Sequence, residues 1–413
     1  MGSSNVLRLR TLIFPPSLLG ALPPAVNITL RNLTAMPVPI KNVSYFYRMA
    51  STTLTISKIE LHSISIPLIE PFVISLGPVY DAENVVVKIH TAEGITGWGE
   101  CSPFMSITGE TAKTGLVVAK HLEKKLLGLN ALDIEQRIAD MDSVIYANNC
   151  IKSAFDMALY DIAAQNAGMP LYQFLGGEKG KPIFTDYTVS VGDIDKMAAD
   201  ALKIKQRGFP VIKVKIGKGG TTDVQRIKAI RDAVGCHIPI RVDANQGWGF
   251  EEAIETLKAL EPYQIQHCEE PLPRWDFMRL PEVRKQSPIP VMSDESCCDH
   301  HDAKRLIDLG ACDLINIKLA KSGGIFKALK MIRLAEDAGM NIQIGAFLES
   351  RLAMTAFAHL ALCSPNIIHF DFDTALMFSK DPVKGGIIYK DAGLIEVPET
   401  TGIGAIIKNE YLS

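Results

Sequence analysis

Eight short apolar runs recur from residue 184 onward, and their regular spacing constrains the fold more than any other feature of the chain. They begin about 23 to 29 residues apart, near Phe184, Val211, Ile240, Ile265, Val291, Leu314, Ile342 and Ile367. Amphipathic segments with helical periodicity lie between several of them, at 222–234, 250–260, 302–309 and 326–338. Eight strand-plus-helix units predict an α/β fold, a (β/α)8 TIM-type barrel with its active site at the carboxyl ends of the strands. A doubly wound sheet is the alternative, but no Gly-X-Gly-X-X-Gly motif follows an early strand.

The region before these runs has a different pattern. Polar and apolar residues alternate at 54–61 and 84–90, which predicts half-buried meander strands. Proline and glycine predict loops over 69–81 and 101–109. Helical periodicity follows at 111–127, 132–144 and 149–168.

These patterns divide the chain into segments. We expect an α+β capping domain over 49–178, a catalytic barrel over 179–384, and a C-terminal segment, 385–413, that returns to the capping domain. Residues 1–48 fit neither part. Two arginines there precede an apolar run that resembles a signal peptide, but Pro15 and Pro16 interrupt it. We therefore expect a disordered or non-native leader outside the fold.

Composition narrows the class of function. The net charge of −3 provides no basic surface for nucleic acid, and the one short apolar run near the start does not suit a membrane span. The eight cysteines are scattered without a Cys-X-X-Cys spacing, which argues against zinc and disulfides and fits a reducing, cytoplasmic compartment. Small-molecule chemistry is therefore the default expectation.

The second run carries two lysines. In a strand over 211–217, Lys213 and Lys215 point to one face while apolar residues point to the other. Two buried ammonium groups side by side should lower the pKa of at least one of them, which would make it a usable general base. The alternative is a solvated edge strand, but flanking apolar residues favour a central one.

Carboxylates end the next three runs. Asp243, Glu269 and Asp294 each follow apolar residues, so three consecutive barrel strands would bring them to one rim. Three carboxylates cannot lie together without a cation, and an all-oxygen site suits Mg²⁺. Any one of them alone would more often be a helix cap or an ion-pair partner.

Further charged residues follow the sixth and eighth runs. Lys318 lies four strands from Lys215, so the two lysines could address opposite faces of one carbon. A structural ion pair between Lys318 and Glu295 is an equally open interpretation. Asp371 and Asp373 share one face by the period-two rule, and a carboxylate pair requires a cationic partner.

These motifs together resemble the enolase superfamily, specifically its muconate-lactonizing-enzyme subgroup and, within it, the dipeptide epimerases such as the L-Ala-D/L-Glu epimerases. The resemblance runs from Thr53 to the C-terminus. Lys213-Val214-Lys215 is similar to the subgroup's Lys-X-Lys motif, and Lys318 in Lys-Leu-Ala-Lys-Ser-Gly-Gly matches its second base. The residues that match its metal ligands are Asp243, Glu269 and Asp294.

The Asp-X-Asp motif at Asp371 and Asp373 resembles the part that singles out the dipeptide epimerases, whose pair holds the substrate's α-ammonium group. The resemblance implies a 1,1-proton transfer that inverts the Cα of the C-terminal residue of a dipeptide, with one Mg²⁺ per subunit on the substrate carboxylate. Lys215 and Lys318 would act as the two bases. Lys213 and Thr188 would bind the substrate. The residues expected to orient the ligands and the lysines are Asn245 and Glu295.

Substrate choice in this superfamily depends on the two loops of the first region. No Lys or Arg lies between residues 69 and 81, and Ile74, Leu76, Val79 and Phe104 are apolar, which favours a small or apolar second residue over glutamate. The closest rivals are an N-acylamino acid racemase, an o-succinylbenzoate synthase or a cycloisomerase, whose substrates lack a free ammonium. A Schiff-base aldolase would need one lysine and no triad of carboxylates, and intact ligands and bases count against a non-catalytic binding protein. We expect a homo-oligomer, as is common for such barrels.

Overall fold

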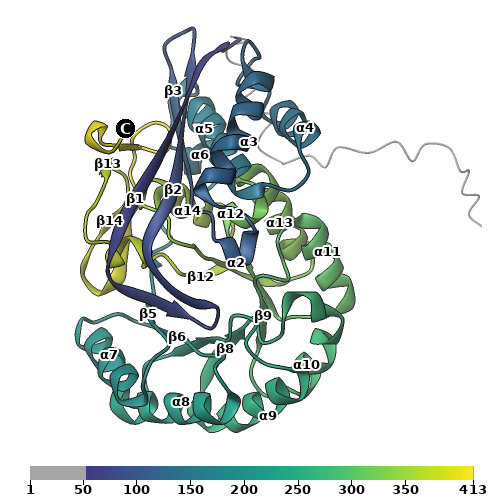
Figure 1. Cartoon of the computed structure of the whole chain (residues 1–413), viewed down its shortest axis with the longest axis vertical. Helices are drawn as coiled ribbons and strands as arrows, with labels where there is room; N and C mark the ends of the chain where they lie inside the picture. Colours follow the sequence, from purple (N-terminus) through teal and green to yellow (C-terminus); the bar gives the residue numbers. More distant parts are fainter. Residues whose placement is uncertain (1–52, 413) are drawn as a thin grey trace, which may run out of the picture.

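The computed structural model describes residues 53–412 (Figure 1). The predicted leader, 1–48, lies outside these residues. Within the described part of the chain, no helix is both long enough and apolar enough to cross a membrane.

An antiparallel sheet and a group of helices form the first part. The sheet has the order β1-β2-β3, with β1 at Ile56–Ile74, β2 at Gly77–Thr91 and β3 at Thr96–Cys101. The helices that follow are α2 (Met105–Thr108), α3 (Ala112–Leu126), α4 (Ile134–Val144), α5 (Asn149–Asn166) and α6 (Leu171–Phe174). The α5 helix lies against β3 so closely that a Cβ at Gly99 would come within 1.9 Å of the Ala154 carbonyl oxygen. Glycine in β3 is therefore required by the packing.

The three helices predicted at 111–127, 132–144 and 149–168 are confirmed as α3, α4 and α5. The loop predicted over 69–81 is wrong, because β1 and β2 continue as a long hairpin that turns after Ile74. Pro71 lies where the strand register shifts, between Pro67 and Phe72, so its missing N–H interrupts no regular pairing. The second predicted loop, 101–109, contains the short helix α2, which ends at Gly109 with φ +73°.

Eight parallel strands form the second part, and they confirm the predicted barrel. Neighbouring strands in the sheet are also consecutive in the chain, and every pairing between them is parallel. The strands are β5 (Tyr187–Val189), β6 (Ile212–Lys215), β7 (Ile240–Asp243), β8 (Ile265–Glu269), β9 (Val291–Ser293), β10 (Leu314–Ile317), β11 (Asn341–Ile344) and β12 (Ile367–Phe370). The sheet curls until its ends meet, where the Asp186 N–H donates to the Phe370 carbonyl oxygen at 3.3 Å.

Helices cover the outside of this sheet, as the arc from α7 to α11 shows in Figure 1. They are α7 (Ile194–Gln206), α8 (Gly220–Val234), α9 (Phe250–Leu260), α10 (Leu280–Gln286), α11 (His300–Leu309), α13 (Ile325–Asp337) and α14 (Arg351–Ala361), while α12 (Leu319–Ser322) is a short turn after β10. Their buried faces and the strands form one large apolar core.

The barrel differs from eight uniform units at its two ends. The run at Phe184 is β4 (Ile183–Phe184), which pairs with β15 (Leu394–Glu396) outside the barrel, and the first barrel strand begins at Tyr187. After β12 the described chain has no α-helix; the single-turn 3-10 helix Thr374–Met377 comes next. Short strands then return the chain across α14: β13 (Val383–Gly385), β14 (Ile388–Tyr389), β15 and β16 (Ala405–Ile407).

The C-terminal segment and the β1-β2 hairpin connect the two parts. Ile403 N–H donates to Asp161 of α5 at 2.7 Å, so the segment contacts the first helical group. At the hairpin tip, Ser75 Oγ donates to the Asn245 carbonyl oxygen at 2.7 Å. Glu100 of β3 accepts from Ser350 Oγ at 2.7 Å and from its N–H at 2.9 Å. The hairpin is thereby held over the carboxyl ends of the strands (Figure 1).

Candidate active site

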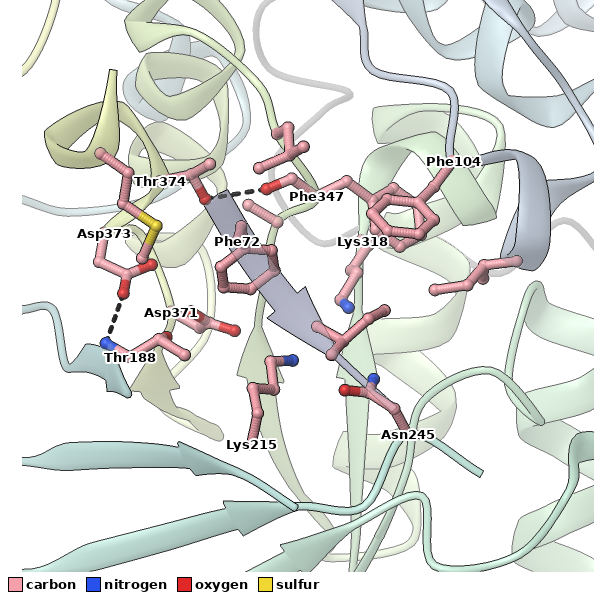
Figure 2. A pocket seen from close by; sticks show the side chains of 15 residues that line it. Phe72, Phe104, Thr188, Lys215, Asn245, Lys318, Phe347, Asp371, Asp373 and Thr374 are labelled. Carbon is pink, nitrogen blue, oxygen red and sulfur yellow. Dashed lines mark hydrogen bonds between the residues drawn. The ribbon is translucent and has the colours of Figure 1, made fainter. Parts of the chain in front are cut away.

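A pocket lies where the hairpin meets the carboxyl ends of the strands. Apolar side chains from the first part form one wall, and the barrel contributes charged side chains together with further apolar ones (Figure 2). The first group comprises Phe72, Ile74, Phe104 and Ile107. The second part of the chain contributes Thr188, Lys215, Asn245, Lys318, Ala346, Phe347, Leu348, Asp371, Asp373, Thr374 and Met377. Such a lining, mostly apolar with a few converging polar groups, is typical of a small-molecule site.

The three carboxylates predicted to bind a metal ion lie together beneath this pocket. Asp243 and Glu269 end β7 and β8, Asp294 directly follows β9, and one oxygen from each lies within 4.8 Å of the others. All three side chains are buried. An all-oxygen set of three carboxylates suits a hard divalent cation such as Mg²⁺.

The remaining oxygen of each carboxylate is held by a neighbour. Asp243 Oδ1 accepts from the Asn245 N–H at 2.9 Å, and Glu269 Oε1 accepts from Asn316 Nδ2 at 2.8 Å. Asp294 Oδ1 accepts from the buried ammonium group of Lys321. Because these contacts fix the carboxylates in place, the triad is preorganised for a cation.

Lys213 lies between two groups of carboxylates. Its Nζ is 2.6 Å from Asp371 Oδ2, 2.8 Å from Glu269 Oε2 and 3.4 Å from Asp243 Oδ2. Burial alone would lower the pKa of Lys213, but these carboxylates raise it well above its ordinary value. The pKa lowering predicted for at least one of the two lysines is therefore not found at Lys213, because nearby carboxylates outweigh burial there.

Lys215 and Lys318 point into the pocket from different sides (Figure 2). Lys215 Nζ lies 2.6 Å from Asp243 Oδ2, and Lys318 Nζ lies 2.7 Å from Asp294 Oδ2. Lys318 thus pairs with Asp294, and within the described residues no ion pair joins it to Glu295. Although burial opposes it, the Asp294 carboxylate raises the pKa of Lys318. The four-strand separation places the two ammonium groups across the barrel mouth, with the pocket between them.

Asp371 and Asp373 follow β12 and line the same pocket. Asp371 pairs with Lys213, whose charge helps to hold the pKa of this carboxyl below its usual range although burial opposes the shift. Asp373 Oδ2 accepts from the Thr188 N–H at 2.7 Å, as the dashed line in Figure 2 shows. Burial and the Asp371 charge raise the pKa of Asp373 to about 7. A positively charged ligand would relieve the repulsion between the two.

Asn245 and Glu295 contact each other at the edge of the metal-binding triad. Asn245 Nδ2 donates to Glu295 Oε1 at 3.2 Å, and the Asn245 backbone is left-handed with φ +41°. Burial raises the pKa of Glu295 to about 7, with Asp294 as the second cause. Asn245 also lines the pocket, so it lies close enough to contact a substrate. A residue that only orients the metal-binding carboxylates would not need to line the pocket.

Several site residues were not predicted from the sequence. Asn316 lies in β10, two residues before Lys318, which directly follows that strand, so the period-two rule could have placed Asn316 inside the barrel. Lys321 reaches Asp294 because α12 begins directly after Lys318. Phe72 and Phe347 lie under the two lysines, with ring centroids 5.8 Å and 4.7 Å from the nitrogens. Nothing in the local pattern marks these two aromatic residues.

The apolar wall agrees only partly with the residues named from the sequence. Ile74 and Phe104 line the pocket, whereas Leu76 is an exposed residue at the hairpin turn and Val79 lies farther along β2. Lys215 and Lys318 are the only Lys or Arg residues among the pocket-lining residues of the described chain. No further cation therefore faces the space between them.

Comparison with known proteins gives consistent matches over most of the chain. Residues 58–176 match the family model of the mandelate racemase / muconate lactonizing enzyme N-terminal domain, and residues 196–411 match the enolase C-terminal domain-like model. The D-Ala-D/L-Ala epimerase of Cytophaga hutchinsonii is 56% identical over 360 residues, which cover 87% of this chain and 98% of that one. The hydrophobic dipeptide epimerase of Enterococcus faecalis is 38% identical over 352 residues, which cover 85% and 99%. The crystal structure of the Cytophaga hutchinsonii dipeptide epimerase with Mg and D-Ala-L-Val has a TM-score of 0.86 and covers 87% of this chain and 98% of its own.

Proposed function

The chain belongs to the dipeptide epimerases of the enolase superfamily, and from that premise we propose that it inverts the C-terminal Cα of dipeptides whose second residue is small or apolar. It is accordingly an isomerase. The observation that carries the proposal is the position of the two lysines on different sides of a pocket that also presents an Asp-X-Asp pair.

Asp243, Glu269 and Asp294 would hold one Mg²⁺, which fits their buried oxygen donors. When bound, Mg²⁺ supplies positive charge that offsets these carboxylates and stabilises the charge that develops on the substrate carboxylate as the Cα proton leaves. The contacts from Asn316 and Lys321 keep the carboxylates aligned for that cation, while Asn245 and Glu295 support the same edge.

Lys215 and Lys318 perform the two proton transfers in this proposal. One removes the Cα proton from its side of the substrate, and the other delivers a proton to the opposite side. Their roles exchange when the substrate has the opposite configuration. The pocket supports this assignment because both ammonium groups face it, each held by one carboxylate of the metal-binding triad.

Asp371 and Asp373 bind the α-ammonium group of the dipeptide. Asp373 has no Lys or Arg partner in an ion pair within residues 53–412, so a bound ammonium group supplies the missing positive charge. Lys213 and Thr188 complete the substrate contacts: Lys213 lies between the two acidic groups, and Thr188 lines the pocket beside Asp373. This arrangement would disfavour N-acyl amino acids, which carry no ammonium.

The side chain of the second residue would lie against the apolar wall. Phe72, Ile74, Phe104 and Ile107 present no cation to a side-chain carboxylate, so alanine or valine should be preferred over glutamate. Complementary apolar contacts discriminate by only about 1–3 kcal/mol for each methylene, so a range of apolar dipeptides is expected.

Proton NMR of the purified protein with Mg²⁺ in D2O tests the proposal. Dipeptides ending in alanine, valine, leucine or glutamate are compared with N-succinyl amino acids. The expected result is loss of the C-terminal Cα-H signal for the apolar dipeptides, together with the appearance of the second epimer. Exchange of N-succinyl amino acids alone would assign the site to an N-acylamino acid racemase instead.

The chain would act as a homo-oligomer in a reducing, cytoplasmic compartment. Two observations support this extension: Trp275 and Met278 are 74% and 63% exposed on one short helical segment, and all eight cysteines are unpaired. Light scattering coupled to gel filtration measures the assembly. A monomeric mass at micromolar concentration would exclude the oligomer.

A further inference from the structure

Asp186 is a buried carboxylate that the proposed mechanism does not use. It directly precedes β5, and only 1% of its surface is exposed. Its Oδ2 accepts from Arg241 Nη1 at 2.8 Å, whereas its Oδ1 has no hydrogen-bond partner within residues 53–412. A buried carboxylate oxygen without a partner is costly, so its position requires an explanation.

The explanation lies in the neighbours of Asp186. One oxygen of Asp186, one of Asp371 and one of Asp373 lie within 4.8 Å of one another, and all three side chains are buried. Asp186 is not itself among the residues that line the pocket, whereas Asp371 and Asp373 are. Asp186 therefore lies behind the pair that faces the substrate.

The charges around this cluster do not balance. Arg241 pairs with Asp186, and Lys213 pairs with Asp371 but is shared with Glu269. Asp373 receives only the N–H of Thr188 and its side chain. Within residues 53–412 only Arg241 and Lys213 form ion pairs with these three carboxylates, and Asp373 forms none, so the cluster can accept one more positive charge.

A proton can supply that charge when no substrate is bound. Burial raises the pKa of Asp186 well above its ordinary value, and the Asp371 charge adds to the shift. The same two causes raise the pKa of Asp373 to about 7. The titratable and charged groups that face the cluster from the surrounding elements are Tyr187 on β5, Lys213 and Lys215 on β6, Arg241 on β7, Lys318 directly after β10, His369 on β12 and Tyr389 on β14.

We propose that Asp186 is a positioning residue of the ammonium site: with Asp371 and Asp373 it retains a proton in the free enzyme, and the dipeptide ammonium group displaces that proton to solvent. The carboxylic acid O–H bond breaks, the proton passes to water, and the ammonium group takes over its charge. This inference rests on the proposed function. To the proposed ammonium site of Asp371 and Asp373 it adds Asp186, a third carboxylate that acts through the other two. It also adds the release of a proton when the dipeptide binds.

Asp186→Asn tests the role of the charge while preserving the shape. The asparagine oxygen can still accept from Arg241, which also keeps its contacts with Gln266 and His369, so the barrel should fold. The substrate is the alanyl-valine stereoisomer that the NMR panel shows to be exchanged. We expect its KM to rise by about tenfold or more, equivalent to about 1.4 kcal/mol, while kcat stays within about twofold.

Two controls separate charge from structure. N-propionyl-valine has the shape of alanyl-valine without the ammonium group, so its dissociation constant should be the same for the wild type and the variant. Asp161→Asn removes an equally buried carboxylate in α5, one that caps backbone N–H groups away from the pocket, and should leave KM unchanged. An unchanged alanyl-valine KM in folded Asp186→Asn would overturn the inference but leave the epimerase assignment intact.

Isothermal titration of the wild type keeps the inference testable even if the variant does not fold. Binding heats at about pH 6 in two buffers of different ionisation enthalpy give the number of protons released. The dipeptide should release about one proton more than N-propionyl-valine, and equal release by both would contradict the proton exchange. Failure of the wild type to exchange any dipeptide would instead contradict the proposed function itself.

Discussion

Replacing Lys318 by methionine should separate the two proton transfers that epimerisation requires. Lys215 remains on its side of the pocket and can still exchange the Cα proton of one substrate epimer with D2O. Inversion also requires a proton from the opposite side, so its rate should fall by about 10³-fold, within the range for loss of a general acid or base. That factor corresponds to about 4 kcal/mol of transition-state stabilisation. Lys215→Met should give the mirror result, with exchange of the opposite epimer only.

The structure indicates that this variant should remain folded. Lys318 Nζ contacts Asp294 Oδ2 at 2.7 Å, but Asp294 keeps a second buried ammonium partner in Lys321. Removing one partner of an isolated buried ion pair costs about 3–5 kcal/mol because a charge is left unpaired. Asp294 is not left unpaired here, so we expect a loss of only about 1–2 kcal/mol. Methionine also retains much of the aliphatic length that packs near Phe347.

The assay is proton NMR in D2O with each pure epimer of one apolar dipeptide, supported by urea unfolding of both variants. Deuterium should enter one epimer only, without formation of the other. Two results would refute the two-base mechanism. One is complete loss of exchange for both epimers in both folded variants, and the other is continued inversion by either variant.

Three further changes test the charges and the apolar wall. Lys213→Met should lower the free energy of unfolding by about 3–5 kcal/mol, because Asp371 and Glu269 lose their shared buried partner; urea unfolding measures this, and wild-type stability would contradict it. Burial raises the pKa of Asp156 to about 8, so the folded state binds more protons than the unfolded state between about pH 4 and 8, and this group makes stability fall as pH rises through that window. Asp156→Asn should therefore flatten the pH dependence of urea unfolding by up to about 1.4 kcal/mol per pH unit, and parallel curves would disprove the assignment. Ile74→Arg should raise kcat/KM for alanyl-glutamate relative to alanyl-valine by about tenfold. Leu76→Arg, at the exposed hairpin turn, is the matched control that should leave this ratio unchanged.

The site residues at the strand ends were predictable from the sequence because they are charged, whereas the runs that precede them are apolar and buried. A lysine or carboxylate directly after a buried apolar run is unexpected unless the barrel mouth uses it, and the period-two rule then selects the inward side chain. This reasoning located Lys215, Asp243, Glu269, Lys318 and Asp371, which the structure brings to one end of the barrel. The regular spacing of the runs predicted the order of the strands in the same way.

The hairpin and the aromatic residues were not predictable on the same basis. Pro71, Gly77 and Pro78 are loop signals in isolation, and only the register shift beside Pro67 shows how the long hairpin accommodates the first of them. Phe72 comes to lie near Lys215 through contact between the first part and the barrel, and Phe347 comes to lie near Lys318 because β10 and β11 are neighbouring strands. Such long-range contacts leave no periodic trace in the sequence around either residue.

The direction in which the pKa of Lys213 changes could not be predicted from the sequence, because it depends on the distances to carboxylates on other strands. From the strand pattern, Lys213 shares its face with a second ammonium group, so a lowered pKa is predicted for at least one of the two lysines. In the fold it also lies between the metal-binding carboxylates and the Asp186, Asp371 and Asp373 cluster, and its contacts with Glu269 and Asp371 link the two. The Asp186, Asp371 and Asp373 cluster lacks one positive charge, because Lys213 is shared with Glu269 and Asp373 forms no ion pair within residues 53–412. In the proposed function, a dipeptide bound beside a divalent cation would present its ammonium group to this cluster and its carboxylate to the cation at the metal-binding triad. The shared lysine therefore matches the site to a zwitterion bound together with a metal ion, a conclusion that depends on which carboxylates Lys213 reaches.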